Sequence, residues 1–203
     1  MRYAVIGTGW IAGSYIQGAA QTGRWELAAV YSRKKETGLA FGAKYGVSTV
    51  YTSLTELAAS DIPAVYIASP NAFHYEQSRM MLEAGKHVVC EKPITVTPEG
   101  YEELRQLAAK KGLIYMEAIM MLHQPHLRSI EDALQKIGRI TSARLDFCQL
   151  SSKYPAYLRG ELPNIFNPQM ATGSLMDLGI YCVYPAVAWF GMPEKITAEA
   201  SFL

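Results

Sequence analysis

The sequence predicts an α/β fold in which a doubly wound parallel sheet is followed by the first part of an α+β domain with a mainly antiparallel sheet. Two features of the 203 residues support this prediction. Short apolar runs alternate with helix-length segments up to about residue 118, and several of those segments end at a glycine. Beyond that point the alternation stops, and longer segments of both kinds follow. We therefore expect one domain over residues 1–118 and a second over residues 119–203.

Six apolar runs in the first domain have the length and composition of buried parallel strands. They are residues 3–6, 26–31, 50–51, 64–68, 87–90 and 113–116. The segments between them are expected to be helices, over residues 10–21, 35–45, 71–84 and 97–111, with a short helix after Ser53. Right-handed crossovers place the carboxyl ends of such strands at one edge of the sheet, where ligands bind.

Helix boundaries in the first domain carry their own signals. Ser53 and Glu56 have the spacing of a capping box, and Thr97 followed by Pro98 is typical of a helix start. The residues at which helices should stop are Gly46, Gly85 and Gly112.

The second domain has a different pattern. Residues 123–136 and 173–190 are expected to be helices, and residues 151–172, rich in Pro, Asn and Tyr, a loop. Alternating side chains over residues 140–150 predict one long strand, and another is expected over residues 195–202. A sheet that is only partly present exposes an edge and a face, which favours association.

The composition argues against several function classes. The formal net charge is +1, so no overall field attracts nucleic acid or anionic lipid. No apolar run reaches about 18 residues and the first strand starts too early for a signal peptide, so we expect no membrane segment and a cytoplasmic location.

The four histidines show no metal-ligand spacing, so we expect no metal site. The three cysteines lack paired spacing, and we expect Cys90, Cys148 and Cys182 to be reduced and packed in the interior.

The first predicted strand ends in a G-x-G-x-x-A loop, made of Gly7, Thr8, Gly9, Trp10, Ile11 and Ala12. Gly7 permits the tight turn, Gly9 lets the backbone approach a pyrophosphate, and Ala12 keeps the following helix close to the strand. The helix N-terminus offers free N–H groups to phosphates. A glycine-bearing turn with no ligand is the alternative, but the loop lies between a strand and a helix, as a dinucleotide-binding Rossmann domain requires.

The second predicted strand ends where such a domain reads the adenosine ribose. A site that prefers NAD has a carboxylate there, whereas this chain has Ser32, Arg33 and Lys34 after Tyr31. A hydroxyl followed by two cations suits a 2′-phosphate, so we expect NADP to be preferred, with NAD possible. The alternative is that Arg33 and Lys34 are solvated loop charges.

Three further segments should meet near the nicotinamide. They contain Ser69, Pro70, Asn71 and His74 after the fourth strand, Glu91, Lys92 and Pro93 after the fifth, and Asp177 and Tyr181 in the second domain.

Each residue type in these segments also has a plain structural interpretation. A lysine at a strand end can polarise a carbonyl or lower the pKa of a neighbouring hydroxyl, but Lys92 could also be a surface lysine. Asp177 and Tyr181 are four residues apart on one helix, so both can face one site. Tyr181 could carry a transferred proton or be a core tyrosine, and His74 could be a capping or surface residue. The peptide bond before Pro93 could be cis.

Together these residues resemble the Gfo/Idh/MocA family of oxidoreductases over essentially the whole chain. The resemblance rests on residues 7–12, on Ser69-Pro70 with His74, on residues 84–88 leading into Glu91-Lys92-Pro93, and on residues 173–181.

The resemblance implies an NAD(P)-dependent dehydrogenase that acts on a sugar, a polyol or a related diol. In that family the counterpart of Lys92 is catalytic, and the position of Asn71 lies near the nicotinamide. Inositol dehydrogenases of the family have a catalytic histidine where this chain has Tyr181. That departure, with residues 116–118, resembles the branch containing dimeric dihydrodiol dehydrogenase and NADP-dependent xylose dehydrogenase, in which a tyrosine is the acid/base.

On this basis we expect hydride transfer between a carbinol carbon and the nicotinamide. Tyr181 is expected to transfer the hydroxyl proton and Lys92 to lower the pKa of Tyr181, while His74 and Asp177 position the substrate. The expected cofactor-binding residues are Gly7, Thr8, Gly9, Trp10, Ile11, Ala12, Ser32, Arg33, Ser69, Pro70, Asn71, His74, Glu91 and Lys92.

Family members are markedly longer, and their second domain completes an antiparallel sheet that supports dimerisation. The resemblance therefore implies a C-terminally truncated chain and a homo-oligomer formed through that sheet. The alternative function is a non-catalytic NAD(P)-binding sensor or regulator of the same fold. Intact Glu91-Lys92-Pro93 and Tyr181 argue against that alternative.

Overall fold

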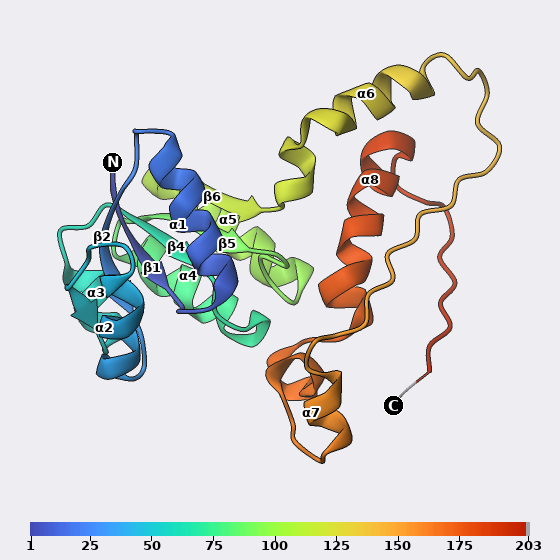
Figure 1. The fold of residues 1–203 in the computed structure, drawn as a ribbon. Helices are drawn as coiled ribbons and strands as arrows, with labels where there is room; N and C mark the ends of the chain where they lie inside the picture. Colours follow the sequence, from blue (N-terminus) through green and yellow to red (C-terminus); the bar gives the residue numbers. More distant parts are fainter. Residues whose placement is uncertain (202–203) are drawn as a thin grey trace.

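The computed structural model describes residues 1–201, and its first part is a six-stranded parallel sheet covered by helices (Figure 1). The strands are β1 (Arg2–Ile6), β2 (Glu26–Tyr31), β3 (Val50–Tyr51), β4 (Ala64–Ile67), β5 (His87–Glu91) and β6 (Tyr115–Ala118). The helices are α1 (Trp10–Gln21), α2 (Lys35–Ala43), α3 (Leu54–Ala59), α4 (His74–Glu83) and α5 (Pro98–Lys111). The predicted doubly wound sheet is therefore confirmed, with the sixth strand starting two residues later than expected.

The strand order is β3-β2-β1-β4-β5-β6, so the direction of winding reverses between β1 and β4. In the register of this pair, Tyr3 lies beside Ala64 and Ile6 beside Ile67. Ligands of doubly wound sheets bind outside the carboxyl ends of strands at such a reversal. The loops after Ile6 and Ile67 are therefore where a site is expected.

Alternate side chains of the strands feed two cores, one on each face of the sheet. On one face Ala4 and Ile6 pack with α3, α4 and α5 through residues such as Leu57, Met81 and Leu104. On the other face Tyr3, Val5 and Tyr66 pack with α1 and α2, through Ala12, Ile16 and Phe41. Because both faces are covered, the strands are apolar throughout, as in other parallel sheets.

The predicted capping residues and glycine stops are confirmed, although α2 ends two residues earlier than predicted and a 3-10 helix, Asn71–Phe73, precedes α4. The Ser53 hydroxyl accepts a hydrogen bond from the Glu56 backbone N–H, and the Thr97 hydroxyl accepts one from Gly100. The residues at the predicted stops have left-handed φ values of +74° (Gly46), +79° (Gly85) and +65° (Gly112).

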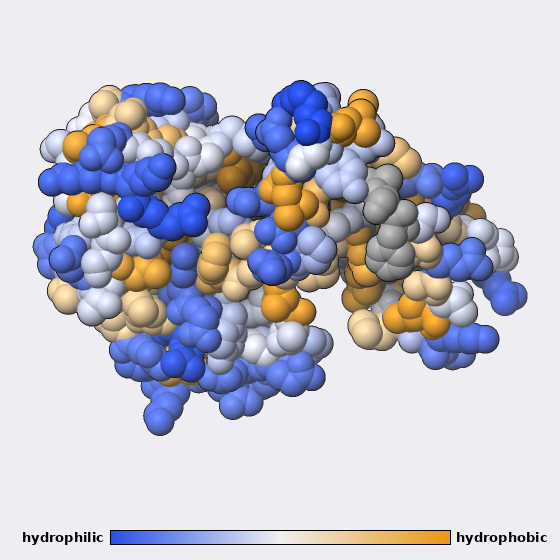
Figure 2. Space-filling model, turned by 90° about the horizontal axis from the view of Figure 1, so that it is seen from below, coloured by the Kyte–Doolittle hydropathy of each residue, from blue (hydrophilic) through white to orange (hydrophobic). Residues whose placement is uncertain are grey.

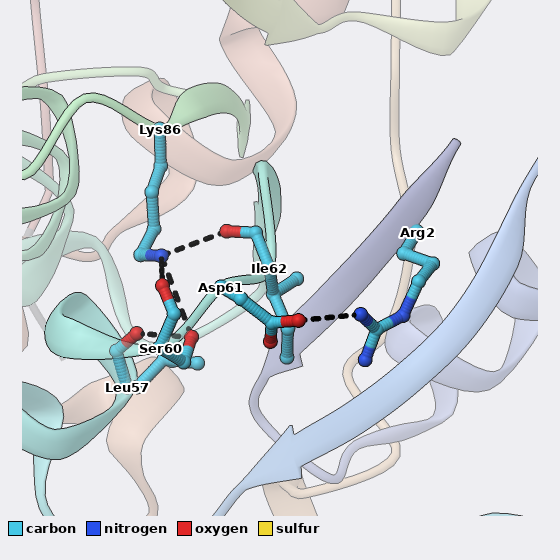
Figure 3. Close-up of polar contacts among 6 residues, drawn as sticks. All are labelled: Arg2, Leu57, Ser60, Asp61, Ile62 and Lys86. Atoms are coloured by element: carbon cyan, nitrogen blue, oxygen red, sulfur yellow. Dashed lines mark hydrogen bonds and ion pairs between the residues drawn. The ribbon is translucent and has the colours of Figure 1, made fainter.

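A buried lysine ties together the amino ends of two strands (Figure 3). Lys86, 3% exposed and just before β5, donates through Nζ to the carbonyl oxygens of Ser60 and Ile62, both at 2.7 Å. Burial lowers the pKa of Lys86. Nearby, Arg2 and Asp61 form an exposed ion pair at 2.8 Å. This cluster lies at the opposite edge of the sheet from the loops after β1 and β4 and is structural.

The second part of the chain contains helices but no strand within residues 119–201. Its α-helices are α6 (Pro125–Leu134), α7 (Tyr154–Leu158) and α8 (Ile180–Phe190), with the π-helix Leu175–Gly179 directly before α8. Short 3-10 helices lie at Met120–His123, Asn164–Phe166 and Pro168–Met170. In Figure 1, α6 extends away from the sheet, and the chain returns past α8 to α7. None of the described helices is long and apolar enough to cross a membrane.

The predictions of strands over residues 140–150 and 195–201 are wrong for the described structure, and residue 202 lies outside it. The alternation over residues 140–150 exists, but a strand needs a partner for its backbone hydrogen bonds. No other segment of residues 119–201 supplies one. The mainly antiparallel sheet expected there is accordingly absent from the described residues.

The second part has little core of its own. Within residues 119–201 the buried apolar side chains are Ile119, Leu127 and Pro185, while Leu150, Leu175 and Met192 are exposed. Figure 2 shows the same contrast, with hydrophilic residues over most of the left-hand bulk and hydrophobic residues at the surface of the middle and right-hand parts.

The small core of the second part also corrects the prediction that all three cysteines are packed in the interior. All three are free, but only Cys90 is buried, while Cys148 is exposed and Cys182 lies between.

Candidate functional site

The carboxyl edge of the sheet gathers the predicted site segments. The loops after β1 and β2 form one side, and the loops after β4 and β5 form the other. The second part of the chain reaches this edge through residues 171–181, which contact Asn71 and Lys92.

Gly7 and Gly9 of the phosphate loop have different structural constraints. Gly7 has a φ of +117°, and a Cβ there would lie 2.5 Å from the carbonyl oxygen of Ala68, at the end of β4. Gly9 has ordinary extended backbone angles (φ −79°, ψ 176°) and nothing within 4 Å of a Cβ position. Gly7 is therefore required by the fold, whereas Gly9 keeps open the space at the start of α1.

The rest of the loop fits a phosphate group. Ala12 is fully buried against the sheet, as predicted. No side chain caps the free N–H groups at the start of α1, so they are available to an anion. Thr8 and Ile11 are partly buried, and Trp10 is 82% exposed at the same edge.

At the end of β2, a buried hydroxyl precedes exposed cations. The Ser32 side chain is 8% exposed, and its Oγ accepts a hydrogen bond of 3.4 Å from the Lys34 backbone N–H. Arg33 is exposed and forms no ion pair within residues 1–201. No carboxylate lies among residues 31–35, so nothing there repels a 2′-phosphate.

His74 lies in the interior rather than in the site. Its side chain is 0% exposed, with Nδ1 2.8 Å from the Pro93 carbonyl oxygen and Nε2 2.8 Å from that of Ser69. Burial lowers the pKa of His74 more than the two carbonyls raise it. In this position the ring connects the loops after β4 and β5 and has no surface exposed to solvent. The nearby Ser69 hydroxyl donates to Gln77 at 2.7 Å.

Lys92 and Asn71 connect the sheet edge to the second part of the chain. Lys92 Nζ donates to the backbone oxygen of Asp177 at 2.9 Å and lies 4.7 Å from the centre of the Tyr181 ring. The Asn71 amide donates to the Ala171 carbonyl at 2.9 Å and to Asp177 Oδ1 at 3.4 Å. The structure thus brings together four of the predicted site residues.

The local backbone explains why Asp177 is held there. Asp177 lies in the π-helix Leu175–Gly179, a rare form that is frequent at functional sites. Asp177 Oδ2 accepts a hydrogen bond of 2.8 Å from the Gly173 backbone N–H, which closes a turn with a φ of +133° at Gly173. The carboxylate of Asp177 therefore binds its own loop and Asn71.

Charge and burial act on the two candidate proton carriers in different ways. Burial lowers the pKa of Lys92, and the carboxylates of Asp177, Glu91 and Glu117 oppose that effect. The pKa of Tyr181 is raised, first by burial and then by Glu91 and Asp177. The pKa of Tyr181 is thus raised overall, and the Lys92 ammonium group lies over the face of its ring.

A cavity of about 350 Å³ opens beside Tyr181. Its lining residues are Met121, Leu145, Asp146, Phe147, Tyr181 and Cys182. The Phe147 ring meets the Tyr181 ring edge-on, with 5.4 Å between centroids. Sequence reasoning missed Phe147, although the alternation over residues 140–150 grouped it with Leu145 on one face.

Glu117 is a second residue that sequence reasoning gave no role. Its carboxylate accepts a hydrogen bond of 2.8 Å from the Ile94 backbone N–H and so holds the chain just after Pro93. Burial raises the pKa of Glu117. The Lys92–Pro93 peptide bond is cis.

Comparison with known proteins agrees with this geometry. Residues 1–119 match the family model described as an oxidoreductase family with an NAD-binding Rossmann fold. The chain is 42% identical over 200 residues to scyllo-inositol 2-dehydrogenase (NADP(+)) of Bacillus subtilis, covering 98% of this chain and 61% of that protein. It is 31% identical to D-xylose 1-dehydrogenase (NADP(+)) 2 of Haloferax volcanii, covering 99% and 61%.

A solved structure has the same fold. It is the 3-ketoreductase KijD10 from Actinomadura kijaniata in complex with NADP and TDP-benzene, with a TM-score of 0.80 and 28% identity, covering 94% of this chain and 57% of that chain. The chain thus spans about three fifths of the length of the relatives it matches. From its sequence and fold, the chain belongs to the Gfo/Idh/MocA family of oxidoreductases.

Proposed function

We propose that the chain carries the cofactor site and the acid/base residues of an NADP-dependent dehydrogenase acting on a hydroxyl carbon of a sugar, polyol or related diol. The observation that carries this proposal is the position of Lys92, which extends from the end of β5 to Asp177 and Tyr181. A sensor needs only the cofactor loops and has no use for a lysine and a tyrosine in contact. The two relatives named above that are NADP(+) dehydrogenases support the same class.

The residues at the sheet edge fit NADP. The open space at Gly9 and the uncapped start of α1 suit the pyrophosphate, and Ser32 with Arg33 suits the 2′-phosphate. When bound, the nicotinamide supplies the hydride acceptor or donor.

The chain's own residues would supply binding, orientation and proton transfer. Lys92 donates a charge-assisted hydrogen bond to the oxygen of the reacting carbon, after exchanging the Asp177 carbonyl for it. In reduction Tyr181, whose raised pKa keeps it protonated at neutral pH, gives its proton to that oxygen. In oxidation the side chain first releases its own proton to solvent, and the tyrosinate then takes the hydroxyl proton of the substrate. Asn71 holds Asp177, and through it the start of α8, against the sheet edge.

A substrate panel tests the proposal. Reduction of NADP is followed by absorbance with scyllo-inositol, D-xylose and trans-1,2-dihydrobenzene-1,2-diol, which the names of relatives suggest. We expect turnover with at least one of them, and its loss in Tyr181→Phe with NADP affinity unchanged. Tight NADP binding with no turnover on the panel or on a wider set of polyols would favour the sensor.

Assembly and location stay predictions. We propose a homo-oligomer and a cytoplasmic location. The described residues lack the second-domain sheet through which association was expected. Light scattering during size-exclusion chromatography measures the mass in solution directly, and a monomer at all concentrations would contradict the first prediction.

A further inference from the structure

We propose that Tyr66 and Glu91 form a positioning pair, in which a buried hydroxyl fixes the carboxylate of the residue that directly precedes Lys92 at the carboxyl edge of the sheet. The inference rests on the proposed function for its catalytic meaning. The contact itself is independent of that function.

The sheet register places the two side chains together. Tyr66 of β4 is the register partner of Val89 of β5, and side chains two residues apart on a strand lie on the same face. Glu91 therefore lies on the same face as Tyr66, one step nearer the carboxyl edge. The Tyr66 hydroxyl donates a hydrogen bond to Oε1 of Glu91.

The ring of Tyr66 is buried and stacked, and its hydroxyl donates to Glu91. Tyr66 is 1% exposed, and the ring of Tyr15 from α1 stacks on it with 3.6 Å between centroids and 6° between planes. Tyr15 in turn meets Tyr3 edge-on at 5.9 Å. The hydroxyl is thus fixed by the helix that begins at the phosphate loop.

The chemistry of the pair makes it a stable hydrogen-bond donor. Burial, and then the charge of Glu91, raise the pKa of Tyr66 well above its ordinary value. The hydroxyl therefore keeps its proton throughout the neutral range and always donates. A carboxylate that accepts such a hydrogen bond is held in one orientation and does not rotate toward the solvent.

The fixed carboxylate then acts on both proton carriers. Glu91 supports the charged form of Lys92, together with Asp177 and Glu117, against the effect of burial. Glu91 also raises the pKa of Tyr181, together with Asp177 and burial. A cationic lysine beside a protonated tyrosine is the state in which Lys92 can bind a carbonyl oxygen and Tyr181 can donate to it.

The test is a titration of the cofactor-free chain by NMR. Lysine labelled at Cε and tyrosine labelled at Cζ report the pKa values of Lys92 and Tyr181, with resonances assigned through Lys92→Met and Tyr181→Phe. Tyr66→Phe removes the hydroxyl and keeps the stacked ring. Tyr3→Phe is the matched control, because Tyr3 belongs to the same aromatic cluster and its hydroxyl makes no hydrogen bond within residues 1–201.

We expect Tyr66→Phe to lower both pKa values by about half a unit to one unit and Tyr3→Phe to change neither. Glu91→Gln removes the negative charge itself and should lower the pKa values of Lys92 and Tyr181 by at least as much. This variant also provides the test if Tyr66→Phe fails to fold. If Tyr66→Phe and Tyr3→Phe changed the two pKa values equally, the Tyr66 hydroxyl would have no specific effect on Lys92 and Tyr181. Unchanged values in Glu91→Gln would overturn the whole inference.

The result of the NMR titration can be distinguished from the result of the substrate panel that tests the proposed function. The titration needs neither cofactor nor turnover, so it can succeed when the substrate panel fails. Where turnover is found, Tyr66→Phe should displace the pH profile of kcat and leave KM for NADP unchanged, which a merely structural role would not do.

Discussion

Two glycines of the phosphate loop allow stability and cofactor binding to be separated by single substitutions. In Gly7→Ala the new Cβ would lie 2.5 Å from the Ala68 carbonyl oxygen, in a backbone with φ +117°. That conformation costs a non-glycine residue about 1–3 kcal/mol, and the clash with a backbone atom adds to it. We expect the free energy of unfolding to fall by about 3 kcal/mol or more.

Gly9→Ala should behave in the opposite way. Its backbone is extended and nothing lies within 4 Å of the added Cβ, so the free energy of unfolding should stay within about 1 kcal/mol of the wild type. The same Cβ occupies the space into which a pyrophosphate must come. We expect at least a tenfold loss of NADP affinity, equivalent to about 1.4 kcal/mol.

Urea unfolding followed by circular dichroism measures the free energy of unfolding, and calorimetric titration with NADP measures the affinity for NADP. The reasoning is refuted if Gly9→Ala binds NADP as the wild type does, because the pyrophosphate then does not approach Gly9. It is equally refuted if Gly7→Ala unfolds at the wild-type urea concentration.

Three further predictions follow from the same structure. Arg33→Ala should weaken NADP at least tenfold and NAD less than threefold in parallel titrations, and equal losses would contradict a role at the 2′-phosphate. Lys86→Met should lower the free energy of unfolding by about 2–4 kcal/mol, because two buried carbonyls at 2.7 Å lose their donor, whereas Arg2→Met at an exposed ion pair should cost under about 1 kcal/mol. The pKa values of Tyr3 and Tyr66 are raised on folding, so above pH 10 the unfolded state loses protons first. The free energy of unfolding, unaffected by these two groups below pH 10, should then fall by about 1.4 kcal/mol per pH unit for each tyrosine, as measured by urea unfolding at a series of pH values above 10.

The sequence was most informative where local rules and burial agree. The caps at Ser53 and Thr97 and the glycine stops formed as predicted. All six strands formed, the sixth two residues later than predicted, because each strand has its neighbours within the chain. The strand expected over residues 140–150 did not form, since alternation predicts a face but cannot supply a partner strand.

The sequence predicted which residues form the site better than it predicted how they contact one another. Asn71, Lys92, Asp177 and Tyr181 meet as expected. Asn71 and Lys92 follow β4 and β5 at one edge of the sheet, and the π-helix and α8 bring Asp177 and Tyr181 to that edge. The burial of His74 between two carbonyls was not visible in the sequence, nor was the position of Lys92 over the face of Tyr181. Both depend on how the loops after β4 and β5 lie against each other and against Tyr181 in space, which residue type and spacing do not give.

The most direct test of the central claim is the turnover of Lys92→Met at saturating NADP, with NADP affinity measured on the same preparation. The account predicts a loss of at least about a thousandfold in kcat, with the NADP Kd within about threefold of the wild type, because Lys92 contacts Asp177 and Tyr181 rather than the phosphate loop. Turnover retained within tenfold would show that Lys92 does not serve the reaction. Loss of NADP binding would show that Lys92 acts in binding the cofactor or in maintaining the fold instead.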